Sequence, residues 1–238
     1  ESGIPDSVPI VMAGGVWYLR DWVDWMNNPE LGTIAFQFGT RPLLTRESPI
    51  PDAWKAKLTT IGEGDVSLHH FSPTGFYSSA VRNSFLRGLE ERSERQIAFS
   101  TEAAGDHQFV LDVGVGRRTC YVTRDDLNRA RGWHAAGFTE ALKTPDNTLV
   151  FVTPDERATI RKDQADCMGC LSHCGFSAWK DHGDYSTGRL ADPRSFCIQK
   201  TLQNIAHGAD PDHELMFAGH SACNFRTDPF YSNGFVPT

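Results

Sequence analysis

The sequence predicts an α/β protein, and three observations near its beginning carry that prediction. Residues 9–13 (PIVMA) form a short apolar run that stops at a glycine pair, which is typical of a buried parallel strand. Residues 19–26 place apolar side chains at helical spacing, and residues 33–38 form a second apolar run that stops at Gly39-Thr40. A strand, a crossover helix and a strand within about 30 residues predict two parallel strands.

Composition places the chain among ordinary globular proteins. It has 238 residues, of which 39% are hydrophobic and 22% charged, and its formal net charge is −7. A net negative charge disfavours a broad nucleic-acid surface, which requires a basic face. No apolar run approaches the roughly 20 residues of a membrane helix, and the first residues show no signal-peptide pattern. We therefore expect no nucleic-acid or membrane partner and a cytoplasmic location.

The middle of the chain mixes strand and helix signals. Apolar runs predict strands over residues 66–71 and 148–153, and a charged amphipathic pattern predicts a helix over residues 78–95. Residues 109–123 indicate a hairpin. These signals describe a small α+β region, distinct from the parallel strands at the beginning.

Two helix starts are marked by capping residues. Thr123 precedes Asp126 by three residues, and Thr153 precedes Glu156 by the same spacing. We divide the chain into three consecutive stretches, which are closing βα units over residues 1–60, the small α+β region over residues 61–160, and a cysteine-rich segment over residues 161–238.

A lone βαβ unit does not bury its own strands. Parallel strands need neighbours on both sides and helices on both faces. We therefore expect further βα units, either earlier in the same protein or in a partner chain.

The two strand ends are candidates for a phosphate site. Ala13-Gly14-Gly15 follows the first strand, and Gln37-Phe38-Gly39-Thr40 follows the second. Ligands of α/β folds bind at the carboxyl ends of strands, and glycines there let a phosphate approach backbone N–H groups, as after the last two strands of a TIM barrel. The alternative is that these glycines only let the strands turn into helices.

These residues also carry a resemblance to a known family. The stretch MAGGVWYLRDW…GTIAFQFGTRPLLTRESP resembles the closing part of the barrel in the nitronate monooxygenase (2-nitropropane dioxygenase) family, and FMN-dependent enoyl-ACP reductases are similar. The family pattern is an AGGI-like strand end, a Q-x-G-T-x-F-like strand end and an acid-Ser pair. Val16 and Pro42 stand where Ile and Phe are commoner.

The resemblance implies the C-terminal part of a TIM (β/α)8 barrel and an FMN-dependent oxidoreductase or monooxygenase. It implies that the flavin phosphate is held by the strand-end residues Gly14, Gly15, Gln37, Phe38, Gly39 and Thr40. It also implies a nitronate or an NAD(P)H-type donor as the small-molecule substrate. The family's catalytic His lies in earlier barrel strands, so no catalytic residue is assigned in this chain.

A second motif lies in the cysteine-rich segment. Cys167, Cys170 and Cys174 form a C-x2-C-x3-C triplet, and Cys197 follows it. Three thiolates this close converge on one metal centre more readily than they form disulfides in a reducing cytosol. Four cysteine ligands suit a [4Fe–4S] cluster or tetrahedral zinc.

The tight triplet with a distant fourth cysteine favours the cluster over zinc, and it resembles a segment of iron–sulfur dienoyl-CoA reductases. Zinc, structural thiols and a redox disulfide remain alternatives, and His173 is a second candidate for the fourth ligand. For the whole chain, the alternative to a flavoenzyme is a zinc-stabilised, non-catalytic interaction module or one subunit of a complex.

Overall fold

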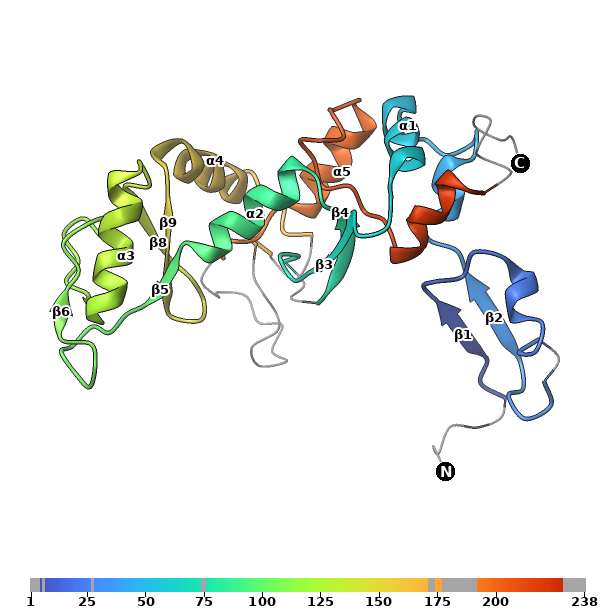
Figure 1. Ribbon diagram of the computed structural model, residues 1–238, viewed down its shortest axis with the longest axis horizontal. Helices are drawn as coiled ribbons and strands as arrows, with labels where there is room; N and C mark the ends of the chain where they lie inside the picture. Colours follow the sequence, from blue (N-terminus) through green and yellow to red (C-terminus); the bar gives the residue numbers. More distant parts are fainter. Residues whose placement is uncertain are drawn as a thin grey trace. The chain divides into compact units, whose positions relative to one another are not determined.

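The N-terminal strands form the parallel pair that the sequence predicts. In the computed structural model, β1 (Ile10–Ala13) pairs in parallel with β2 (Ile34–Gln37), with Ala13 opposite Gln37. Figure 1 shows the two strands side by side and pointing the same way. The structure describes residues 5, 7–26, 28–73, 76–170, 174–176 and 192–228.

The helix in the connection between β1 and β2 is shorter than predicted. Only η1 (Leu19–Trp22), a 3-10 helix, forms where the apolar spacing predicted a helix over residues 19–26. Trp22 contacts the rings of Trp25 and Phe36 edge-on, whereas Val23 remains 57% exposed. The helix prediction was wrong in extent, because half of the apolar stripe has no described surface to pack against.

The chain divides into two compact units, which are described separately. The first comprises Glu1–Leu68, Ser79–Asn83 and Asn204–Thr238, and the second comprises His69–Ser78 and Ser84–Gln203. The first unit therefore combines segments from both ends of the sequence, whereas the three predicted stretches are consecutive.

The core of the first unit contains no residue of β1 or β2. Besides these strands the unit contains η1, η2 (Arg41–Leu44), α1 (Asp52–Thr60) and η3 (His220–Arg226). Its buried core residues are Trp17, Leu44, Trp54, Leu58, Ile61, Val81, Ile205, Met216, Ala218, Ala222 and Phe225. The C-terminal part of this unit is thus packed into the same core as α1.

A short sheet replaces the beginning of one predicted helix. β3 (Val66–His69) pairs with β4 (Ser78–Val81), and α2 starts only at Ser84 and ends at Glu94. The Val81 N–H donates to the Met216 carbonyl, and Ala80 bridges Phe217. The prediction of a helix from residue 78 was therefore wrong in its first residues, which pair with a segment far along the chain.

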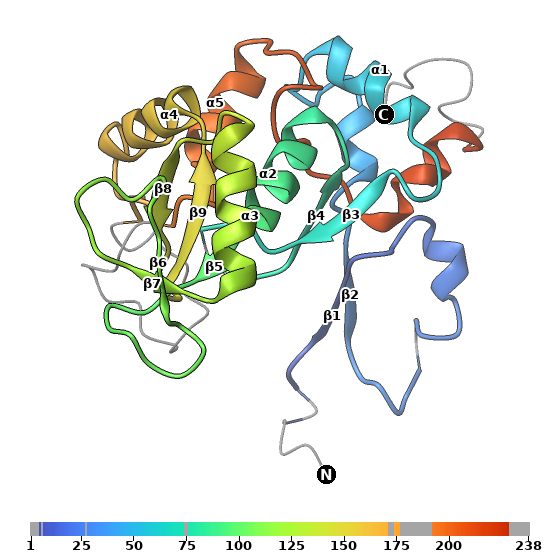
Figure 2. The same ribbon diagram turned by 60° about the vertical axis from the view of Figure 1, so that its left-hand side comes forward.

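The second unit contains a three-stranded antiparallel sheet in the order β5-β9-β8. Its strands are β5 (Gln96–Ala98), β8 (Glu140–Lys143) and β9 (Thr148–Val152), and a hairpin of β6 (Phe109–Val110) and β7 (Tyr121–Val122) lies in the same unit. Its helices include α3 (Arg124–Ala135) and α4 (Pro154–Ala165), which lie beside the sheet in Figure 2. α5 (Ile198–Ala206) crosses the division between the units.

Both predicted helix starts are confirmed. The Asp126 N–H donates to Thr123 Oγ1 at 3.1 Å at the start of α3. At the start of α4, Thr153 and Glu156 form a reciprocal capping box, with Glu156 N–H donating to Thr153 Oγ1 and Thr153 N–H donating to Glu156 Oε2. These bonds satisfy helix N–H groups that otherwise lack partners.

The mixed α/β class is confirmed, whereas no closed barrel is seen among the described residues. Within that same part of the chain, no helix combines the length and apolarity needed to span a membrane.

Candidate functional site

The candidate site lies at the carboxyl ends of β1 and β2. Because the two strands are parallel and in register, Gly14-Gly15 and Gly39-Thr40 leave the sheet at the same edge. Gly14 and Gly15 have φ angles of +85° and +69°. Glycine is the residue that adopts this left-handed backbone without strain, so the glycine pair is required for the chain to turn here.

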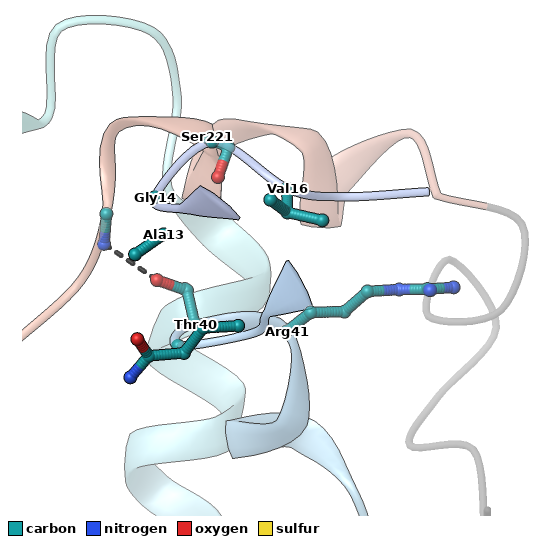
Figure 3. Close-up of a pocket in the computed structure, with 10 residues that line it drawn as sticks. Ala13, Gly14, Val16, Thr40, Arg41 and Ser221 are labelled. Carbon is teal, nitrogen blue, oxygen red and sulfur yellow. Dashed lines mark hydrogen bonds between the residues drawn. The ribbon is translucent and has the colours of Figure 1, made fainter. Parts of the chain in front are cut away.

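A pocket of about 260 Å³ opens at this edge. Figure 3 shows the side chains around it. Its lining residues come from both strand ends and from the start of η3: Ala13, Gly14, Gly15, Val16, Gln37, Gly39, Thr40, Arg41, Gly219 and Ser221. Five of the six predicted flavin-binding residues therefore line one pocket, and Phe38 is the one that does not.

The glycines of the pocket leave room beside the backbone. An added Cβ at Gly14, Gly15 or Gly39 would meet no other atom within 4 Å. The backbone N–H groups of Gly15 and Gly39 donate no hydrogen bond to any other residue that the structure describes. Open N–H groups beside unfilled space are the arrangement that binds the oxygens of an anion.

Among the described residues, no cationic side chain is directed into the pocket. Figure 3 shows the Arg41 side chain running away from it. The Arg41 guanidinium donates to the Trp17 carbonyl at 3.1 Å, and its Nε lies 3.7 Å from the carboxylate of Asp228. An anion in this pocket would therefore be bound by neutral donors.

The ion pair behind the pocket also affects a tyrosine. Desolvation raises the pKa of the Tyr18 phenol, and the hydrogen bond and charge of the Asp228 carboxylate raise it further. Arg41 lies 4.8 Å from the centre of the Tyr18 ring, and its charge opposes this shift. Tyr18 is accordingly a neutral hydrogen-bonding group at ordinary pH.

Besides the two strand ends, a third segment lines the pocket, and no sequence signal predicted it. The Gly219 N–H donates to Thr40 Oγ1 at 2.7 Å, and Ser221 lies beside it. Thr40 and Gly219 are separated by 179 positions in the chain. No periodic pattern or turn signal in the C-terminal segment pointed to the strand ends.

The four cysteines of the second motif have different environments. Cys174 is buried, Cys167 and Cys197 are half-buried, and Cys170 is exposed. All six cysteines of the chain lie among the described residues, and none of them forms a disulfide. His173 lies outside the described residues.

Backbone N–H groups point at three of these sulfurs. Gly175 N–H donates to Cys167 Sγ at 3.2 Å, Phe176 N–H to Cys174 Sγ at 3.1 Å, and Lys200 N–H to Cys197 Sγ at 3.4 Å. In the part of the chain that the structure describes, however, no three His, Cys, Asp or Glu side chains are placed to hold one metal ion. The predicted metal centre is therefore not assembled there.

Comparison with known proteins agrees with the strand-end pattern. The family model described as nitronate monooxygenase matches residues 4–156, which include both glycine-bearing strand ends and most of the second unit. Comparison with curated proteins and with solved structures found no match. Nitronate monooxygenases are flavin-dependent oxidoreductases in general. The chain belongs to the nitronate monooxygenase family.

Proposed function

We propose that this chain binds the phosphate end of FMN in the pocket at the ends of β1 and β2, as part of a nitronate monooxygenase-like oxidoreductase. The observation that carries the proposal is the pair of unpartnered N–H groups of Gly15 and Gly39, together with the open space beside Gly14, Gly15 and Gly39. A phosphate monoester offers several acceptor oxygens to such donors. Family membership supplies the flavin as the group that brings this phosphate.

The size of the pocket fits one end of the cofactor. Sites for whole small molecules usually measure about 300–1,000 Å³, and this pocket holds about 260 Å³. The pocket suits a phosphate with the neighbouring part of the chain that carries it. When bound, the flavin supplies the redox chemistry between a nitronate or an NAD(P)H-type donor and an acceptor, while this chain holds the phosphate and excludes water from it.

We also propose that β1 and β2 are closing strands of a TIM barrel. Ile10 and Val11 of β1 are 43% and 56% exposed, although parallel strands are normally covered on both faces. Further parallel strands, from the same protein or from a partner chain, would cover them. This arrangement would place the flavin ring against residues outside this chain, and no catalytic residue is proposed here.

Substitution of Gly39 tests the phosphate site. Gly39→Val places a branched side chain in the space proposed for the phosphate, so we expect the holoprotein to lose its FMN. The measurement is the flavin-to-protein ratio after gel filtration. Gly88→Val is the matched control, because Gly88 in α2 also has open space around an added Cβ and lies in the other unit. Unchanged flavin content in Gly39→Val would remove Gly39 from the site.

For the cysteine motif we propose a [4Fe–4S] cluster, with a zinc ion as the alternative. Support comes from the C-x2-C-x3-C spacing and from the three N–H···S hydrogen bonds, which stabilise thiolates. The described side chains do not converge on one point, and we route no chemistry through this group. A thiol-rich motif of this kind also supports the proposed cytoplasmic location.

Elemental analysis tests the second proposal. Anaerobically prepared protein should contain iron and acid-labile sulfide in equal amounts, and Cys170→Ser should lose both. Cys223→Ser is the control, because Cys223 lies outside the motif. Zinc without iron would favour the zinc-stabilised interaction module, and the absence of both metals would leave structural thiols.

A further inference from the structure

A segment outside the family match completes the candidate pocket. The match ends at residue 156, yet Gly219 and Ser221 line the pocket together with the strand-end residues. All of these residues belong to the first compact unit. Neither family membership nor the strand-end pattern assigns any role to this segment.

The segment fixes the direction of the Thr40 hydroxyl. A threonine hydroxyl both donates and accepts hydrogen bonds. Thr40 Oγ1 accepts the Gly219 N–H at 2.7 Å, so its own hydrogen is left for another acceptor. Figure 3 shows this bond crossing from the C-terminal segment to Thr40 at the edge of the pocket. A phosphate oxygen can only accept at neutral pH, so the bond prepares Thr40 as a donor to it.

Close approach explains why residue 219 is a glycine. Gly219 has φ −75° and ψ 162°, a conformation that any residue adopts. An added Cβ, however, would lie 3.1 Å from Thr40 Oγ1. The absence of a side chain at residue 219 is therefore what permits the short bond to Thr40.

Ser221 presents a second hydroxyl to the same space. Figure 3 shows its oxygen pointing into the pocket, opposite Thr40. The side chain of Ser221 makes no hydrogen bond to any residue among those described. Because Arg41 is directed away, the side-chain donors that remain for an anion are the Ser221 and Thr40 hydroxyls and the Gln37 amide.

The segment is firmly held in its unit. Ala222 and Phe225 of η3 are fully buried, and the Phe225 ring contacts Trp17 edge-on with ring centres 4.7 Å apart. Trp17 Nε1 also donates to Asp228 Oδ2 at 2.8 Å. These contacts follow Ser221, and the bond from Gly219 to Thr40 precedes it, so the Ser221 hydroxyl has a defined position, which is what an efficient binding group requires.

We propose that Gly219–Ser221 forms the third wall of the phosphate site. In this arrangement Ser221 binds the phosphate directly, and Gly219 is a positioning residue that orients the Thr40 hydroxyl toward it. The inference rests on the proposed FMN phosphate site. It adds two residues from outside the family match to that site and assigns a role to each.

The test compares FMN with riboflavin, which lacks the phosphate. Dissociation constants of both flavins are measured on the reconstituted full protein by fluorescence quenching. A hydrogen bond to a charged group is worth enough that Ser221→Ala should weaken FMN binding about tenfold. Riboflavin binding should not change. Ser67→Ala, at a half-buried serine in β3 of the same unit, is the matched control and should change neither constant.

The positioning role is tested by combining substitutions. Thr40→Val should weaken FMN binding by a similar factor, and Thr40→Ser should restore it. Gly219→Ala should weaken FMN binding when Thr40 is present and have no further effect in Thr40→Val. Additive effects of Gly219→Ala and Thr40→Val would overturn the positioning role.

Two failures can be told apart. If Gly39→Val abolishes FMN binding while Ser221→Ala changes it less than twofold, the third wall is wrong and the phosphate site stands. Equal weakening of FMN and riboflavin by Ser221→Ala would also overturn the third wall. If the unmodified protein binds FMN no more tightly than riboflavin, the phosphate site itself is wrong, and this inference falls with it.

Discussion

The two sheets that carry the longest apolar runs differ in how they are covered. Residues 149–152 of β9 are at most 1% exposed, whereas Ile10 and Val11 of β1 are 43% and 56% exposed. Both runs are rich in Val, Ile and Leu, and both predict buried strands. Their sequences are alike, and their surroundings are not.

The difference lies in what packs on each face. In the antiparallel sheet, Leu149 and Phe151 join a core with α3, while Val150 and Val152 join a core with Ile160 of α4. In the parallel pair, Trp22 contacts Phe36, and no residue of β1 or β2 is buried. An antiparallel sheet with a helix on each face buries its own apolar side chains, whereas two parallel strands need neighbouring strands and helices to bury theirs. The first unit therefore contains the candidate site, but the described residues do not bury the faces of its two strands.

The largest effect should come from shortening a buried side chain of the antiparallel sheet. Phe151→Ala removes a fully buried ring and should lower the free energy of unfolding by about 3–5 kcal/mol. Urea unfolding followed by circular dichroism measures this. Val110→Ala, at a 52% exposed position of the same unit, should cost less than about 0.5 kcal/mol. Equal costs for the two variants would refute the assignment of the core.

An intermediate effect should come from acidification. Burial and, to a smaller extent, the positive charge of His70 lower the pKa of His69 to about 4, against the opposing charge of Glu90. His69 is 3% exposed, and its Nε2 has no described hydrogen-bond partner. Because the folded-state pKa lies below the unfolded value of about 6.5, stability is retained above pH 6.5 and lost as the pH falls toward 4.

The size of this loss can be measured by difference. Between pH 7 and pH 5 the titration of His69 should cost about 2 kcal/mol of the free energy of unfolding. His69→Phe keeps a ring between Phe71 and Phe196 and should abolish that part of the pH dependence. His70→Gln should keep most of it, because His69 remains. An unchanged pH dependence in His69→Phe would show that His69 is hydrated in solution.

The smallest effect should come from the uncovered strand. Val11→Ser changes a side chain that is 56% exposed and should cost less than about 0.5 kcal/mol in this chain. The same substitution should cost more once further strands cover β1, because burying a valine contributes about 1.5–3 kcal/mol. A large cost in the chain alone would mean that the β1 face is already covered in solution.

Local patterns predicted much of this molecule correctly. The parallel strands, the strand over residues 148–153 and the capping residues Thr123 and Thr153 follow from signals within a few residues. The glycines at the strand ends are recognised from their immediate neighbours in the same way, and they line one pocket with Gln37 and Thr40, but the binding role of these five residues stays a prediction. The nitronate monooxygenase pattern depends on these same local features.

Other features depended on contacts between distant segments. Residues 78–81 form a strand because Val81 bonds to the Met216 carbonyl, although their pattern continues that of α2. The spacing of the four cysteines predicted a metal centre, but the described side chains are not brought together around one metal ion.

The sequence by itself determined the α/β class, the glycine-bearing strand ends and the family, because each is encoded in short stretches with a defined spacing. Only the tertiary structure decided that Gly219 and Ser221 lie at the edge of the pocket. A hydrogen bond between residues 179 positions apart depends on how the whole unit packs around Trp17 and Phe225, and no local pattern encodes that packing.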